Sequence, residues 1–315
     1  MEIDHQGTLK ALDVLKRMMA PCVLCPRQCR IDRMAGENGF CGLAAEIVVS
    51  DAMPHHGEEP PLTGTHGAGT IFFSSCNLRC LYCQNHQISR HTKGQVMNPE
   101  DLAQVMLRLQ EQGCHNIDAV TPTPQTPLIM AALLSARRQG LIIPFVYNCG
   151  GYESMEVIRL LAGMVEIYLP DMKYGRDDLA WQLSGAKEYA VHAMASLREM
   201  TAQVGDVLEV VDGVARRGLL IRHLVLPGMI DNSFAILEMI QRGLSIQVPL
   251  SIMSQYTPAA QAQRHPLLGR RLYREEYEKV VNYAMELGFE QLFIQEVDKR
   301  NLLPDFEKQA PFNWE

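Results

Sequence analysis

The sequence predicts an α/β protein: a partial (β/α)6-type barrel that carries a small cysteine-rich module at its N-terminus. Two observations predict this fold. From Thr70 onward, short β-branched or aromatic runs alternate with segments of helical periodicity, which indicates parallel strands joined by right-handed crossovers. Residues 1–60 instead combine an amphipathic helix, a cysteine-rich stretch and a loop rich in Gly and Pro. We therefore expect a module at 1–60 and a barrel at 61–315, with a doubly wound sheet as the alternative to the barrel.

The composition limits the classes of protein to which the chain can belong. Of its 315 residues, 47% are hydrophobic and 21% are charged, so the chain can bury a sizeable core. The formal net charge of −7 argues against a broad basic face for nucleic acid. No apolar run reaches the roughly 18 residues that span a bilayer, and the first residues lack the apolar region of an export signal. We expect a cytoplasmic protein with reduced thiols and with neither membrane nor nucleic-acid partners.

A helix is expected over residues 7–19, and four cysteines follow it in the pattern C-x2-C-x3-C-x11-C: Cys22, Cys25, Cys29 and Cys41. Four thiolates so close in sequence, among turn-forming glycines, fit a structural zinc site. They fit a second iron–sulfur cluster for electron relay equally well. A bound metal would stabilise a module that is too short for a large core of its own. Reduced free thiols are the remaining interpretation.

Parallel strands are expected along the barrel, with helices between them. Runs of β-branched and aromatic residues place the strands at 70–73, 116–121, 142–147, 164–169, 219–226, 248–253 and, more weakly, 291–295. Apolar periodicity places helices at 98–113, 127–140, 153–163 and 277–288. The first of these helices has Asn98 as its N-cap and Pro99 at N1, and it stops at Gly113.

Unusual residues follow the ends of the first four strands: SSCNLRCLYCQN, TPTPQ, NCGGY and PDMKY. In parallel α/β folds the carboxyl ends of the strands meet at one edge, and active sites gather there. We therefore expect one functional site at this edge.

The segment after the first strand contains Cys76, Cys80 and Cys83 in the pattern C-x3-C-x2-C. Three thiolates can each bind one iron of a four-iron cube, and the segment has no fourth cysteine. One iron would remain open to a ligand from outside the protein, as in catalytic rather than structural metal sites. Zinc is the weaker interpretation, because three thiolates leave its tetrahedral site incomplete. Three unligated thiols are the other alternative.

The cysteine motif and its surroundings resemble the radical S-adenosylmethionine (radical SAM) superfamily. Within it, the sequence is similar to the branch of the pyruvate formate-lyase-activating enzyme, in particular to homologues termed PflX-like. The resemblance extends from Glu58 to Pro258 and rests on the stretches GEEPPLTG, IFFSSCNLRCLYCQNHQIS, VTPTPQTP, YNCGGYE, IYLPDMKY, RHLVLPG and SIMSQYTP.

The resemblance implies an enzyme with a [4Fe-4S] cluster on Cys76, Cys80 and Cys83, whose open iron chelates S-adenosylmethionine. One electron cleaves this cofactor, and the 5′-deoxyadenosyl radical abstracts hydrogen from a substrate. The resemblance further implies an electron donor such as flavodoxin or ferredoxin. The substrate is either a glycyl residue of a partner enzyme or another peptide or small molecule. Alternatives from other classes are an electron-transfer protein without S-adenosylmethionine chemistry and a zinc-dependent adaptor.

The resemblance also assigns cofactor contacts to individual residues. Tyr82 matches the position that lies against adenine, and Asn148 matches a polar position that faces the ribose or methionine part. Asp171 and Lys173 resemble a D-x-K pair that contacts the methionine part, with Lys173 as the partner of its carboxylate. Arg222 is expected to point into the barrel, where its partner is a cofactor carboxylate or Asp171.

One motif of the activating enzyme is missing from this chain. That enzyme has Gly-Gly-Glu after its second strand, for the amino group of S-adenosylmethionine, whereas this chain has TPTP there. The hydroxyl groups of Thr121 and Thr123, or a main-chain carbonyl, would then receive the ammonium group. Four further residues are expected to pack or to lie on the surface rather than to bind a cofactor: Cys149, His223, Glu58 and Glu59.

Overall fold

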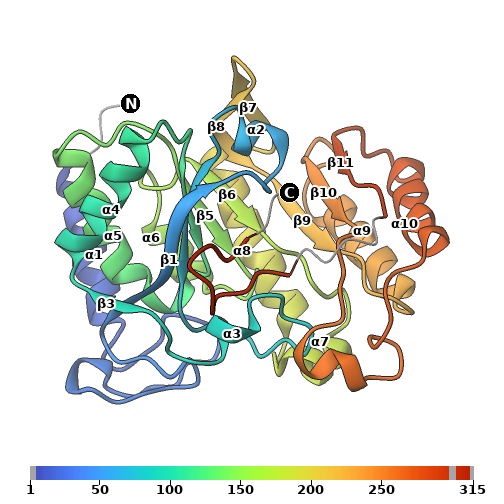
Figure 1. Cartoon of the computed structure of the whole chain (residues 1–315), viewed down its shortest axis with the longest axis horizontal. Helices are drawn as coiled ribbons and strands as arrows, with labels where there is room; N and C mark the ends of the chain where they lie inside the picture. The colour runs from blue at the N-terminus through green and yellow to red at the C-terminus, as the bar shows by residue number, and fades with distance from the viewer. Residues whose placement is uncertain (1–4, 298–302, 313–315) are drawn as a thin grey trace.

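Four parallel strands form the centre of the larger sheet in the computed structural model, which describes residues 5–297 and 303–312. In the order in which they pair, they are β2 (Ala68–Phe73), β4 (Ile117–Val120), β5 (Phe145–Cys149) and β6 (Ile167–Pro170). A second parallel sheet contains β9 (Ile221–Leu224), β10 (Leu250–Met253) and β11 (Leu292–Ile294). A backbone bridge between Asp171 and Arg222 joins the two sheets. The predicted partial barrel is confirmed (Figure 1).

Helices cover the outer face of the barrel (Figure 1). Asn98 caps one of them by accepting a hydrogen bond from the Asp101 backbone over 2.9 Å, as the sequence predicts. Apolar side chains from the helices and from the outward faces of the strands form the main core. The helices are α4 (Pro99–Glu111), α5 (Thr126–Arg138), α6 (Met155–Leu160), α8 (Tyr189–Val204), α9 (Ile230–Gly243) and α10 (Arg274–Glu286).

The larger sheet extends beyond the predicted strands. β1 (Ile47–His55) pairs antiparallel with β2, and β3 (Gln95–Met97) pairs with β1. At the other edge, β7 (Leu208–Val211) and β8 (Val214–Leu219) form a hairpin. The predicted strand 219–226 is divided, because β8 ends at its first residue and β9 follows. The domain boundary at residue 60 stays a prediction, although β1 precedes it and belongs to the sheet of the barrel.

The N-terminal helix α1 (His5–Arg17) packs against α5 and α6, and the cysteine-rich stretch follows it. The remaining elements are short and lie in connections: η1 (Arg33–Ala35), α2 (Pro60–Thr63), α3 (His86–Ser89), η2 (Thr123–Gln125), α7 (Asp177–Ser184) and η3 (Ala260–Arg264). Within residues 5–297 and 303–312, no helix is both long and apolar enough to cross a membrane.

The C-terminal segment 303–312 lies against the inner face of the barrel. Along β2, Ile71 and Phe73 pack into the main core under the helices, so the intervening Phe72 faces inward. The rings of Phe306 and Phe312 lie 5.3 and 5.2 Å from that of Phe72. This segment, dark red in Figure 1, therefore covers part of the barrel interior near α3.

Candidate active site

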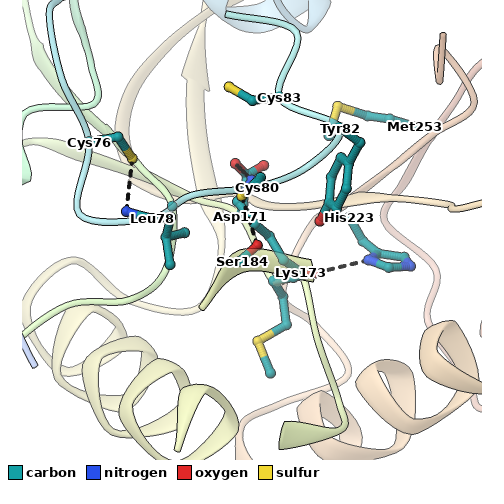
Figure 2. Close-up of polar contacts among 12 residues, drawn as sticks. Cys76, Leu78, Cys80, Tyr82, Cys83, Asp171, Lys173, Ser184, His223 and Met253 are labelled. Carbon is teal, nitrogen blue, oxygen red and sulfur yellow. Dashed lines mark hydrogen bonds and ion pairs between the residues drawn. The ribbon is translucent and has the colours of Figure 1, made fainter. Parts of the chain in front are cut away.

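The three cysteines of the C-x3-C-x2-C motif lie in the loop that joins β2 to α3 (Figure 2). All three are free thiols. Ser75, which precedes the motif, has a φ of 75°, a left-handed conformation that is strained for a residue with a side chain. The Leu78 N–H donates to Sγ of Cys76 over 3.3 Å, and such a bond favours the thiolate. The loop thus turns sharply after the strand and places its thiols at the carboxyl edge of the sheet.

The charges of neighbouring thiols affect the pKa of Cys76 and Cys83. Burial raises the pKa of Cys76 and Cys83, and the charge of Cys80 raises both further, whereas Lys173 lowers them. Among the described residues, no three His, Cys, Asp or Glu side chains are arranged to hold a single metal ion. In an iron–sulfur cube each thiolate binds a different iron, so its ligands stand further apart than those of one ion. Three thiolates are the donor set that the resemblance implies for a [4Fe-4S] cluster, and they would leave a zinc ion one ligand short.

Asp171 and Lys173 follow β6 and lie beside the cysteine loop (Figure 2). Lys173 Nζ is 2.5 Å from Asp171 Oδ2, and the two side chains remain 21% and 24% exposed. Burial alone would lower the pKa of Lys173, but the charges of Asp171 and Cys80 raise it well above its usual value. Gly151, with a φ of 75°, permits this arrangement, because a Cβ there would lie 2.2 Å from the Asp171 carbonyl oxygen. Lys173 is therefore a partly buried positive charge next to the thiols of the cysteine loop.

A chain of hydroxyl groups connects Tyr82 to Cys80. Tyr82 Oη donates to Tyr174 Oη over 2.9 Å, and Ser184 Oγ donates to Sγ of Cys80 over 2.9 Å. Tyr174 Oη and Ser184 Oγ are 2.5 Å apart. Because the Ser184 proton points to sulfur, Tyr174 is the donor to Ser184. The sequence analysis missed Tyr174 and Ser184, since no local pattern marks contacts made 92 and 104 residues along the chain.

Arg222 has partners other than those expected. Its guanidinium binds the carboxylates of Glu58 and Glu59, with Nε donating to Glu59 over 2.9 Å, whereas Asp171 pairs with Lys173. Glu58 and Glu59 are not surface residues as expected, because their side chains are only 7% exposed. Burial would raise the pKa of Glu58, but the charges and hydrogen bonds of Arg222 and His55 together outweigh it and lower that pKa to about 2. Arg222 thus pairs with two buried carboxylates inside the barrel.

The two threonines that follow β4 have different surroundings. Thr121 is half-buried and has a φ of 63°, the left-handed conformation that is strained for threonine. Thr123 is buried and donates to the carboxylate of Glu153 over 2.8 Å. Burial raises the pKa of Glu153 to about 7, and the sequence analysis gave no sign of this buried carboxylate. The Thr123 hydroxyl is therefore already used inside the protein, and the Thr121 hydroxyl is the more accessible of the two.

Asn148 and His223 are both buried. Asn148, on β5, donates to Asp118 on β4 over 3.2 Å, so it lies on the inner face of the barrel, as Arg222 does. His223 packs toward α9, as expected, and its ring nitrogens each lie 2.8 Å from an oxygen, of Met172 and of Ser233. Cys149, at the end of β5, is 2% exposed and packs in the main core, as expected.

Comparison with known proteins connects this geometry to a family. The family model described as the radical SAM superfamily matches residues 70–240, which include the cysteine loop, Asp171, Lys173 and Arg222. An uncharacterized protein of Methanocaldococcus jannaschii is 29% identical over 290 residues, covering 90% of this chain and 79% of that protein.

Two solved structures share the fold. Streptococcus suis SuiB bound to S-adenosylmethionine aligns with a TM-score of 0.51 and 10% identity, covering 70% of this chain and 48% of SuiB. Methylornithine synthase, PylB, aligns with a TM-score of 0.50 and 14% identity, covering 71% of this chain and 63% of PylB. The chain thus spans less than two-thirds of either protein, and at these identities the likeness concerns the fold alone.

Proposed function

This chain belongs to the radical SAM superfamily, and we propose that it cleaves S-adenosylmethionine reductively and removes a hydrogen atom from a substrate. In this proposal Cys76, Cys80 and Cys83 hold a [4Fe-4S] cluster. The observation that carries the proposal is the set of three free thiols in one loop at the carboxyl edge of the sheet, beside the ammonium group of Lys173. Three thiolates on four irons leave one iron free for the cofactor.

The cofactors supply the hard chemistry when bound: one electron breaks the bond between the sulfonium sulfur and the 5′ carbon, which releases methionine and a 5′-deoxyadenosyl radical. The residues of the chain bind and orient these groups. Lys173 pairs with the carboxylate of the methionine part, and Asp171 holds the lysine side chain in place. The hydroxyl chain that ends at Ser184 stabilises a thiolate at Cys80.

The ammonium group of the cofactor needs an acceptor, because the family's Gly-Gly-Glu motif is missing. Thr121 is our candidate, since it is partly exposed and held in a strained conformation directly after β4. Thr123 is the weaker candidate, because its hydroxyl already donates to Glu153. Tyr82 and Asn148 remain candidates for the adenine and for the ribose or methionine part, respectively.

For the substrate, we favour a glycyl residue of a partner protein. The resemblance of the stretches between Glu58 and Pro258 to the branch of the pyruvate formate-lyase-activating enzyme supports this choice. Flavodoxin or ferredoxin is the proposed electron donor. The substrate rests on sequence resemblance alone, whereas cleavage of S-adenosylmethionine also rests on the geometry of the site.

An anaerobic assay tests the cleavage step. Reconstituted protein is reduced with dithionite and incubated with S-adenosylmethionine, and 5′-deoxyadenosine is measured by liquid chromatography. We expect the nucleoside from the wild type and from Cys114→Ala, which alters a buried cysteine in another part of the core. We expect none from Cys80→Ala. An intact cluster in the wild type without 5′-deoxyadenosine would identify an electron-transfer protein instead.

A labelling experiment tests the substrate. Cells of the source organism are grown on glycine deuterated at the α-carbon, and their extract is separated into protein and small-molecule fractions. Each fraction is incubated with the reduced enzyme and S-adenosylmethionine. We expect deuterium in 5′-deoxyadenosine from the protein fraction only. Transfer from the small-molecule fraction alone would contradict glycyl-radical formation while leaving the cleavage chemistry intact.

A further inference from the structure

The four cysteines of the N-terminal region line one cavity. All four are free thiols, and the chain between the first and the last of them includes η1 and several turns. Gly39 contributes to the wall, and a Cβ at this position would lie 3.0 Å from Sγ of Cys29. The lack of a side chain at Gly39 therefore leaves room for the Cys29 sulfur. The cavity is lined chiefly by Cys22, Cys25, Cys29, Cys41, Arg27 and Asn77.

Backbone N–H groups in this loop point at the thiols. The Phe40 N–H donates to Sγ of Cys29 over 3.5 Å. Backbone hydrogen bonds also reach Cys25 from Arg27 and Cys41 from Leu43. At both cysteines the donor is two residues further along the chain, which is the arrangement of Leu78 and Cys76 in the first cysteine set. In both loops, therefore, backbone N–H groups donate hydrogen bonds to cysteine sulfur atoms.

Positive charges surround the cavity as well. Arg33 is 2% exposed, lines the cavity and donates to the Pro124 carbonyl over 2.6 Å. Arg27 lines the same cavity. Several thiolates on one metal centre carry net negative charge, so a buried guanidinium beside them stabilises the loaded form.

The placement of the thiols bears on the choice between a cluster and a single ion. A tetrahedral zinc site holds all four sulfur atoms at about 2.3 Å from one ion. In the part of the chain that the structure describes, no three such ligands are placed to share one ion. The same holds for Cys76, Cys80 and Cys83, in the family whose three-cysteine loop holds a four-iron cube. Four thiols around a cavity, each able to bind a different iron, fit a cube with no open position.

This cavity adjoins the first cysteine loop. Arg27 Nε donates to the carbonyl of Asn77, the residue after Cys76, over 2.6 Å. Ser75 Oγ donates to the carbonyl of Cys41, and Arg79 Nη2 donates to the Phe40 carbonyl over 2.6 Å. The two cysteine-containing loops are therefore packed against each other and joined by hydrogen bonds.

We propose that Cys22, Cys25, Cys29 and Cys41 hold a second [4Fe-4S] cluster, bound to the protein at all four irons and packed against the loop of the first. This site does not depend on the proposed function, because its four ligands come from a different segment. It differs from the first in having no open iron, so S-adenosylmethionine has no position at which to bind it.

Metal analysis and electron paramagnetic resonance (EPR) of anaerobically reconstituted protein test this site. Three variants are compared with the wild type: Cys22→Ser/Cys25→Ser, Cys76→Ser/Cys80→Ser/Cys83→Ser, and the control Cys114→Ser. We expect about eight irons per chain in the wild type and the control, and about four in each of the other two. The EPR signal of the reduced first-site variant should not change when S-adenosylmethionine is added. The signal of the variant that lacks Cys22 and Cys25 should change.

Two results would overturn the second cluster. One is a wild type with about four irons and one zinc per chain, the zinc being lost in the Cys22→Ser/Cys25→Ser variant. The other is a first-site variant that folds, by circular dichroism, yet holds no iron. Failure of the proposed function has a different signature, namely about eight irons in a protein that forms no 5′-deoxyadenosine.

Discussion

The Ser184 hydroxyl donates a hydrogen bond to the Cys80 sulfur over 2.9 Å, from a residue that follows it by 104 positions. This contact fixes the end of α7 against the cysteine loop. It also places a donor on one of the three proposed cluster ligands, and hydrogen bonds to sulfur are among the factors that set the reduction potential of an iron–sulfur cluster.

Ser184→Ala is expected to lower the reduction potential of the first cluster. Loss of a hydrogen bond to a charged group costs roughly 1.5–3 kcal/mol, which corresponds to a shift on the order of 60–130 mV for one electron. Potentiometric EPR titration measures this shift. The control is Ser196→Ala, a buried serine that bonds only to backbone carbonyls of α8. An equal shift in both variants would remove Ser184 from the cluster environment.

Lys173→Ala is expected to weaken binding of S-adenosylmethionine by about 10- to 100-fold, the worth of one charge-assisted hydrogen bond. The iron content should stay at the wild-type value, because the cysteine ligands are unchanged. Equilibrium dialysis with labelled cofactor measures the affinity. Lys187→Ala serves as the matched control, since that ammonium group lies over the Trp181 ring and belongs to neither site. Wild-type affinity in Lys173→Ala would exclude this lysine from the cofactor site.

Arg222→Met is expected to lower the free energy of unfolding by about 3–5 kcal/mol, because it leaves the buried Glu59 carboxylate without its cation and Glu58 with only its His55 contact. Urea denaturation at neutral pH measures the change. Arg242→Met provides the comparison, since Arg242 is exposed and its pair with Glu238 contributes well under about 1 kcal/mol. If Arg222→Met affected only cofactor affinity and not stability, Arg222 would be a cofactor ligand as the sequence resemblance implies.

His223 is expected to make the protein sensitive to acid. Burial lowers its pKa from 6.5 to about 4, so the folded state binds this proton less tightly than the unfolded state. The folded state therefore keeps its full stability above the pKa of 6.5 that this group has in the unfolded state. It loses stability as the pH falls from there through the folded-state pKa of about 4. Between about pH 7 and about pH 4.5 the loss amounts to roughly 2–3 kcal/mol. Urea denaturation of wild type and His223→Gln at both pH values measures it, and identical pH dependence in the two proteins would contradict this assignment.

The parallel strands and the cysteine loop are predictable because local patterns encode them. Runs such as TIFF and the spacing of Cys76, Cys80 and Cys83 are visible in a few adjacent residues. β1 was not predicted, since it contains Asp51 and Pro54, which are uncommon in strands, and its partner strand stabilises it from outside the segment.

The partners of the charged residues are harder to predict from sequence. An inward arginine requires an anion, but the sequence cannot tell that Glu58 and Glu59, 164 and 163 residues away, supply it. The same limit applies to Ser184 and Cys80. Such contacts depend on how the whole barrel closes, and neither residue type nor spacing records this.

The central claim is that one iron of the cluster on Cys76, Cys80 and Cys83 is open and binds S-adenosylmethionine. Electron–nuclear double resonance of the reduced Cys22→Ser/Cys25→Ser variant with cofactor labelled at its amino nitrogen and carboxylate oxygen tests it most directly. We predict hyperfine coupling from both labels to the cluster. An intact reduced cluster that shows coupling to neither label would contradict the account.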